Sequence, residues 1–149
     1  MFGPGVTEPT IQTTRKTLTF TGASGFGAVN TSATVYTVTG DVLLHALICK
    51  CTTNLSESGA TATVSLGTVG QLTRFIGNTN SVDIDADEAW VRATPTPGSI
   101  DLPDAMQSVL IVSGDDIVVR CLTQGTTAGV LEFTVFWEPV SAGATLVAA

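Results

Sequence analysis

Residues 39–53, TGDVLLHALICKCTT, decide the fold of this chain because they form its longest apolar run. In an extended strand, side chains alternate between two faces, and here both alternating sets are largely apolar. One set holds Val42, Leu44, Ala46 and Ile48, and the other holds Leu43, His45, Leu47, Cys49 and Cys51. A helix is the alternative, but Gly40-Asp41 starts the run as a turn does and Cys-Thr-Thr ends it with weak helix formers. We therefore predict a central strand, buried on both faces, in an all-β domain.

Further strand patterns surround this central strand. They lie at residues 15–20, 33–38, 60–66, 71–76, 81–86, 108–112, 117–122 and 130–137. In the last of these, Leu131, Phe133, Val135 and Trp137 share one face. The helix signal is weakest everywhere, with at most one turn at 102–108, and three Pro mark 93–104 as an exposed loop. Eight or nine short antiparallel strands predict a single-domain β-sandwich with jelly-roll topology.

Three segments divide the chain. Residues 1–14 contain two Pro and two Gly without periodicity and predict an extended N-terminal arm. Residues 15–140 form the β-sandwich domain, which is long enough to bury one core. Residues 141–149, SAGATLVAA, predict a mildly apolar C-terminal tail.

The charge balance excludes several classes of partner. Six Lys and Arg stand against 13 Asp and Glu, which gives a net charge of -7 and argues against nucleic acid and against an anionic membrane surface. Charged residues make up 13%, about half the usual share, while Thr occurs 25 times, so hydroxyl groups solvate the surface. The first residues have no basic and apolar signal pattern, so we expect a protein made in a cytosol.

The candidate metal ligands do not follow a known spacing. The chain has three cysteines, Cys49, Cys51 and Cys121, so at least one cannot form a disulfide within the chain. Side chains at i and i+2 on one strand run parallel, so Cys49 and Cys51 do not pair with each other, and we predict buried free thiols. His45, Cys49 and Cys51 are the right ligand types for zinc, but no turn lets two thiolates converge. We expect no metal and no cofactor.

Asp83, Asp85 and Asp87 match the first three ligands of a calcium loop. The loop is incomplete, because Glu88 stands where Gly is required and Thr94 where a bidentate Glu belongs. As a strand, this segment would turn Val82 and Ile84 inward and its carboxylates toward solvent. A cation held between subunits remains the alternative.

The sequence does not indicate an enzyme. His45 is the only histidine and lies in the most apolar strand, where a satisfied core or interface histidine is the expected role. The Gly-rich segment 22–31 fits neither a P-loop nor a dinucleotide loop, and no G-x-S-x-G motif occurs. The sequence does not exclude two carboxylates that converge in the fold, as glycoside hydrolysis requires.

Four strings carry a resemblance to a known class: TGDVLLHALICKCTT, ATVSLGT, SGDDIVVRC and VFWEPVSAGATLVAA. Over residues 35–149 the chain resembles small structural proteins of tailed bacteriophages, of the type that decorate or cement the head. The resemblance implies a non-catalytic virion protein that sits on the outer capsid surface and binds neighbouring major capsid protein subunits. It also implies a homo-oligomer, with a trimer favoured over a dimer.

The two ends of the chain are the predicted contact segments for a capsid or another subunit. Their apolar anchors are Phe2, Val6, Ile11, Leu146 and Val147. Simple disorder of the termini is the alternative. Packing between subunits could also use Trp90, Phe26 or Tyr36.

Two other functions remain open from the sequence alone. One is a tail or neck component of the same virion. The other is a carbohydrate- or receptor-binding module, because a β-sandwich does not decide function. A sugar-binding face needs exposed aromatic side chains, and this chain has two Trp, one Tyr and six Phe to fill its core first.

Overall fold

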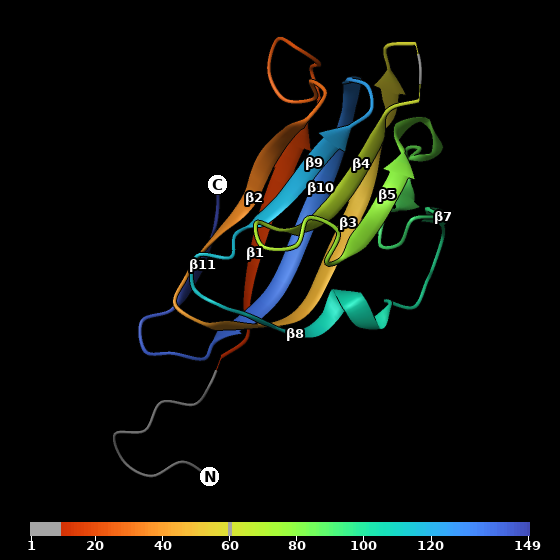
Figure 1. The fold of residues 1–149 in the computed structure, drawn as a ribbon. Coiled ribbons are helices and arrows are strands. Elements are labelled where there is room, and N and C mark those ends of the chain that lie inside the picture. The colour runs from red at the N-terminus through yellow and green to blue at the C-terminus, as the bar shows by residue number, and fades with distance from the viewer. Residues whose placement is uncertain (1–9, 60) are drawn as a thin grey trace, which may run out of the picture.

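The computed structural model describes residues 10–59 and 61–149 and shows a sandwich of two antiparallel β-sheets (Figure 1). The first sheet has the order β1-β10-β3-β6-β7, and β8 also pairs with β3. The second sheet has the order β11-β2-β9-β4-β5. No α-helix occurs in the described ranges, so the all-β prediction is confirmed.

The strands of the first sheet are β1 (Gln12–Thr19), β3 (Val42–Glu57), β6 (Glu88–Ala89), β7 (Thr96–Pro97), β8 (Gln107–Ile111) and β10 (Thr126–Pro139). Those of the second sheet are β2 (Thr31–Thr39), β4 (Thr63–Thr68), β5 (Ile76–Asn80), β9 (Ile117–Leu122) and β11 (Thr145–Ala148). Two single 3-10 turns, η1 (Ser81–Asp83) and η2 (Asp104–Met106), lie between strands.

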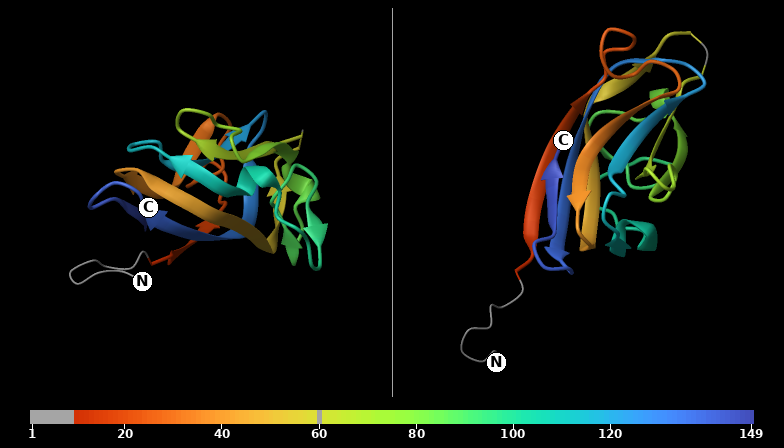
Figure 2. Two further views of the ribbon diagram at one scale, coloured as in Figure 1. Left: turned by 90° about the horizontal axis from the view of Figure 1, so that it is seen from below. Right: turned by 60° about the vertical axis from the view of Figure 1, so that its left-hand side comes forward.

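The connectivity is that of a jelly roll. Strands β1, β3, β8 and β10 lie in the first sheet, while β2, β4, β5 and β9 lie in the second, so the chain crosses between the layers at almost every connection. All paired strands run antiparallel. The two layers are visible end-on in Figure 2 (left). The predicted jelly-roll topology is therefore confirmed.

The strands β3 and β10 are the two long central strands of the first sheet. They are 16 and 14 residues long, so the expectation of uniformly short strands is wrong for these two. The expected inner face of β10 is confirmed, because Leu131, Phe133, Val135 and Trp137 are all buried. The outer face of β3 differs from its prediction: Leu43 and Ile48 are only half-buried, because no third layer covers the first sheet.

The segment between β4 and η1 also departs from its predicted pattern. Residues 71–75 form a loop that folds back on β4, with Phe75 N–H donating to Leu66 O at 3.0 Å. Residues 77–80 lie between two of the predicted strands, but they belong to β5, where Thr79 is buried and accepts a hydrogen bond from Trp90 Nε1 at 3.0 Å. This tertiary hydrogen bond and the pairing with β4 outweigh the local turn preference of Gly and Asn.

Both ends of the sandwich domain extend beyond their predicted limits. Residues 12–14 of the expected arm already belong to β1, and residues 145–148 of the expected tail form β11, which pairs with β2. Figure 2 (right) shows β11 beside β1, so the two sheets approach each other at this side.

Thr14 ties these strands together. Its hydroxyl donates to Leu146 O at 3.4 Å and accepts from Trp137 Nε1 at 3.0 Å, while Tyr36 Oη donates to Thr14 O at 3.0 Å. These contacts join β1 and β10 of the first sheet to β2 and β11 of the second. They satisfy buried polar groups that would otherwise cost free energy.

Candidate interaction surface

A β-bulge in β3 shapes the outer face of the first sheet. Trp137 of β10 pairs with Leu44 and Phe136 pairs with Ala46, so His45 is an extra residue without a partner in the register. Buried positions on β3 are therefore even-numbered up to residue 44 and odd-numbered from residue 47. As a result, His45 and Ala46 are both half-buried and both face outward.

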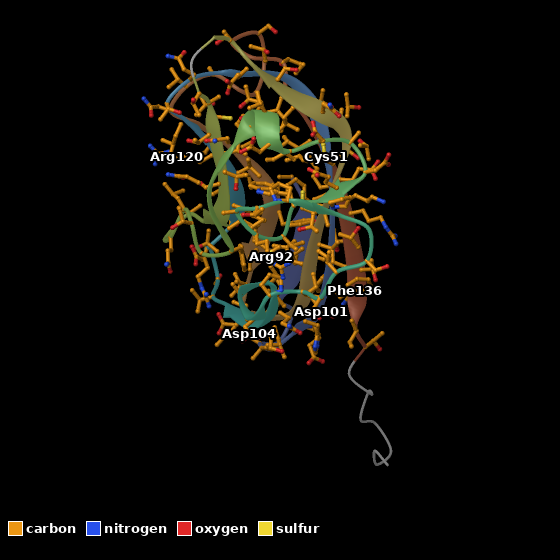
Figure 3. All side chains as sticks on the ribbon, turned by 90° about the vertical axis from the view of Figure 1, so that its right-hand side faces the viewer. Cys51, Arg92, Asp101, Asp104, Arg120 and Phe136 are labelled. Atoms are coloured by element: carbon orange, nitrogen blue, oxygen red, sulfur yellow. The ribbon has the colours of Figure 1, made fainter. Side chains whose placement is uncertain are left out.

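Beside the bulge lies an apolar area that we call the outer apolar patch, made of Leu43, Ala46, Ile48, Leu110 and Phe136. Leu43 pairs with Leu110 of β8, and Ala46 pairs with Phe136 of β10, so the patch crosses three neighbouring strands. Leu110 is 57% exposed and the others are half-buried. Figure 3 places Phe136 on the side of the sandwich opposite Arg120 of the second sheet.

More exposed apolar side chains lie at the same end of this sheet. Ile11 precedes β1, Val112 follows β8 and Val140 follows β10, and all three are more than half exposed. Val140 N–H donates to Asp41 O at 2.8 Å, which fixes the chain as it leaves the sheet. Apolar side chains that gather on one exposed surface are typical of sites that contact another molecule.

The bulge carries one ion pair. His45 Nε2 lies 3.0 Å from Glu138 Oε1, and the two side chains are 32% and 24% exposed. At this exposure the pair contributes little to stability, because water screens it and two side chains lose freedom. His45 is thus half-buried at the margin of the outer apolar patch, outside the core.

The other half of the face is charged. Lys50 of β3 pairs in register with Glu132 of β10. Arg15 of β1 pairs with Thr134, two residues further along β10, and Arg15, Lys50 and Glu132 are all exposed. A surface depression of about 190 Å³ is lined by Arg15, Lys16, Thr17, Glu132, Phe133 and Thr134. Lys16 Nζ also donates to Ala149 O, across to the end of the second sheet.

The charges of the outer face balance one another. Arg15 and Lys50 stand against Glu132 and Glu138, while the chain as a whole carries a net charge of -7. The excess negative charge therefore lies elsewhere in the chain. An acidic partner therefore meets no net charge on this face.

The three cysteines are free and buried, as predicted. Burial raises the pKa of Cys49 well above its ordinary value, and it raises the pKa values of Cys51 and Cys121 to about 11. Neutral thiols are poor metal ligands and poor nucleophiles. The bulge removes His45 from the face that carries the cysteines, and within the described ranges no three His, Cys, Asp or Glu side chains could hold a metal ion.

The acidic segment is not the expected strand. Residues 81–83 form the turn η1, and Val82 is 47% exposed, although Ile84 is buried as predicted. Asp83, Asp85 and Asp87 are all exposed, and the segment is held through its backbone, with Asp87 N–H donating to Cys51 O at 2.9 Å. The pairing with β3 replaces the predicted alternation here.

The predicted contact residues have different surroundings. Phe2 and Val6 lie outside the described residues. Ile11 and Val147 are 54% and 50% exposed, so their side chains remain accessible. Leu146 is 1% exposed and belongs to the core, because β11 pairs with β2, and its side chain is therefore removed from the candidate contact set.

The aromatic side chains mostly fill the core. Trp90, Trp137 and Tyr36 are 0%, 3% and 0% exposed, and these are all the Trp and Tyr residues of the chain. Phe26 is half-buried and its ring centroid lies 5.1 Å from that of Phe20. Trp90 and Tyr36 are thus core residues in the isolated chain, and neither is accessible for packing between subunits.

Comparison of the sequence with protein-family models and with curated proteins finds no match. The fold is similar to that of a chain in the capsid asymmetric unit of cyanophage Pam1, with a TM-score of 0.55 and 15% sequence identity. The match covers 93% of this chain and 92% of the cyanophage chain, so the two share one fold almost from end to end. In the described part of the chain, no helix is long and apolar enough to span a membrane.

Proposed function

We propose that this chain is a structural protein of a phage virion that decorates the outer capsid surface and stabilises it by binding neighbouring major capsid protein subunits. The observation that carries the proposal is the jelly roll shared, over 93% of the chain, with a chain of a phage capsid asymmetric unit. The sequence resemblance to head decoration proteins points the same way. The role is non-catalytic and needs no cofactor, and the protein is made in the host cytoplasm, where virions assemble.

The physical character of the chain supports a role in a lattice. Its surface is rich in Thr and poor in charge, and its buried thiols and aromatic side chains stabilise the core. Many copies that each bind weakly to adjacent sites on a shell gain through avidity. Such a protein needs contact surfaces rather than a cleft with converging catalytic groups.

The copy number in purified particles tests this proposal directly. Quantitative mass spectrometry of the virions compares this chain with the major capsid protein. Near-equal abundance is the expected result for a protein that covers the lattice. A few copies per particle would refute decoration and favour the tail or neck alternative, and absence from the particles would refute both.

The N-terminal contact is tested by a deletion. We propose that the segment with Phe2 and Val6 attaches the sandwich to the capsid, so removal of residues 1–9 should abolish binding to shells assembled from the major capsid protein. The sandwich should fold unchanged, because β1 begins at Gln12. A matched control is Val69→Lys, which alters an exposed apolar residue in a loop of the second sheet, outside the predicted contact segments. Unchanged binding after the deletion would contradict the proposed contact.

The carbohydrate-binding alternative loses its main support. Stacking on sugar rings needs exposed aromatic faces, and every Trp and Tyr of this chain is buried. Phe136 lies on the outer face of the first sheet, but it is half-buried within the outer apolar patch. A glycan array with no bound sugar is the expected result.

A further inference from the structure

The outer face of the first sheet has a pattern that fits a second copy of itself. It lies on β1, β10, β3 and β8, in that order, and its side chains are aligned across the strands by the register of the sheet. A two-fold axis that runs along the strands between β3 and β10 would place β3 of one copy opposite β10 of the other. Each residue would then face the residue with which it is paired in its own sheet.

Under this symmetry the charges are complementary. Lys50 of β3 is in register with Glu132 of β10, so Lys50 of each copy would face Glu132 of the other. The two opposite-charge pairs would form reciprocally. Charge pairs of this kind fix register and orientation between partners.

One apolar pair also matches in size. Phe136 is in register with Ala46, so a large side chain of each copy would face a small one of the other. Leu110 of β8 is level with Leu43 and Glu138, and Ile11, one residue before β1, is level with the same Glu138. The symmetry therefore brings Leu110 and Ile11, which are 57% and 54% exposed, toward each other.

We propose that the outer face of the first sheet is the interface at which two copies of this chain form a face-to-face dimer. The occupant is a second copy because Lys50 and Glu132 would pair reciprocally and the face has no net charge of its own. Two chains that each carry -7 can therefore bring these faces together without net repulsion between them. Two β-sheets that pack face to face lie about 10 Å apart. The proposal does not depend on the capsid role, because it concerns the purified chain alone.

A pair of charge reversals tests the interface. Lys50→Glu gives each copy two acidic side chains at the proposed contact, and Glu132→Lys gives each copy two basic ones, so each variant should pair with itself more weakly than the wild-type chain does. Mixed together, the two variants should form a one-to-one dimer, because each then faces the opposite charge. Analytical ultracentrifugation measures both states. Arg74→Glu is the matched control, since Arg74 is exposed in the loop of the second sheet and the net charge changes equally.

The expected result is a wild-type dimer at roughly 100 μM, with dissociation constants at least about tenfold weaker for each single variant and restored in the mixture. Arg74→Glu should dimerise as wild type does. A wild-type chain that stays monomeric at this concentration would overturn the proposal. A mixture that does not associate, or an equal loss in Arg74→Glu, would overturn it too.

A second variant pair covers the apolar half of the face and does not depend on the charge pairs. Leu110→Lys should abolish the dimer, whereas Val69→Lys, which alters a residue of 59% exposure on the second sheet's loop, should leave it intact. Both positions are exposed, so neither change should affect folding, and the melting temperature checks this. Equal dimerisation by the two variants would place the interface elsewhere and refute the proposal.

Discussion

Substitution of Thr79 by Val should destabilise the protein by about 1–3 kcal/mol. Thr79 Oγ1 accepts the hydrogen bond of Trp90 Nε1 at 3.0 Å, and the two residues are 2% and 0% exposed. Valine has the same shape but no acceptor, so the indole N–H would remain buried without a partner. The lost donor to Gly77 O matters less, because Gly77 is exposed and water can replace it.

Urea denaturation measures this effect. For a small domain the free energy of unfolding falls by about 1–3 kcal/mol per molar urea, so the midpoint should fall by roughly 1 M. The slope should stay the same, since the substitution does not change the surface exposed on unfolding.

A double-mutant cycle separates the hydrogen bond from other effects. Trp90→Phe removes the N–H group and also leaves a cavity, so it is destabilising by itself. In that background Thr79→Val has no donor to leave unpaired and should cost about 1 kcal/mol less than in the wild type. Equal costs in the two backgrounds, or a neutral Thr79→Val, would refute the assigned role of this bond in holding β5 against residue 90.

Three further predictions follow from the core and the second sheet. Gly67→Ala should destabilise by at least about 1 kcal/mol, because its Cβ would lie 2.2 Å from Gln71 O, whereas Gly77→Ala, with no atom within 4 Å, should stay within about 0.5 kcal/mol in the same urea assay. The buried cysteine thiols should react with a thiol reagent at pH 8 only after unfolding, and reaction in the native state would contradict their neutral, buried condition. Burial raises the pKa values of Cys51 and Cys121 from about 9 to about 11, so the folded state holds protons that the unfolded state releases. The free energy of unfolding should therefore fall as the pH rises from about 9 to about 11. Cys121→Ala should lessen this fall, and an unchanged dependence on pH would argue against the raised pKa of Cys121.

The outer apolar patch shows how strand parity can be misread. Apolar residues on both faces of the strand at 39–53 predict that both faces are buried, and the inner face is indeed buried. The outer face remains uncovered in the single chain because a two-layer sandwich has no element to place there. The pattern nevertheless carries information, since a sheet face that is apolar in sequence and open in structure is the expected mark of an interface.

The amino-acid sequence by itself determined the fold class, the jelly-roll sandwich and the inner face of β10. These follow from the two-residue period of a strand and from the Gly, Pro and Asn signals between strands, which act over a few neighbouring residues. Low charge is likewise a property of composition, and it led to the expectation that neither nucleic acid nor an anionic membrane is a partner.

Only the tertiary structure decided the bulge at His45, the extension of β1 to Gln12 and the capture of the last residues as β11. Each depends on partners distant in the chain: Glu138 lies 93 residues from His45, and Leu146 lies 132 residues from Thr14. A local pattern cannot encode which strand will offer the matching register or the missing hydrogen-bond partner. Pairing energy between distant strands makes that choice, because unpaired backbone groups and exposed apolar side chains cost more than any local preference.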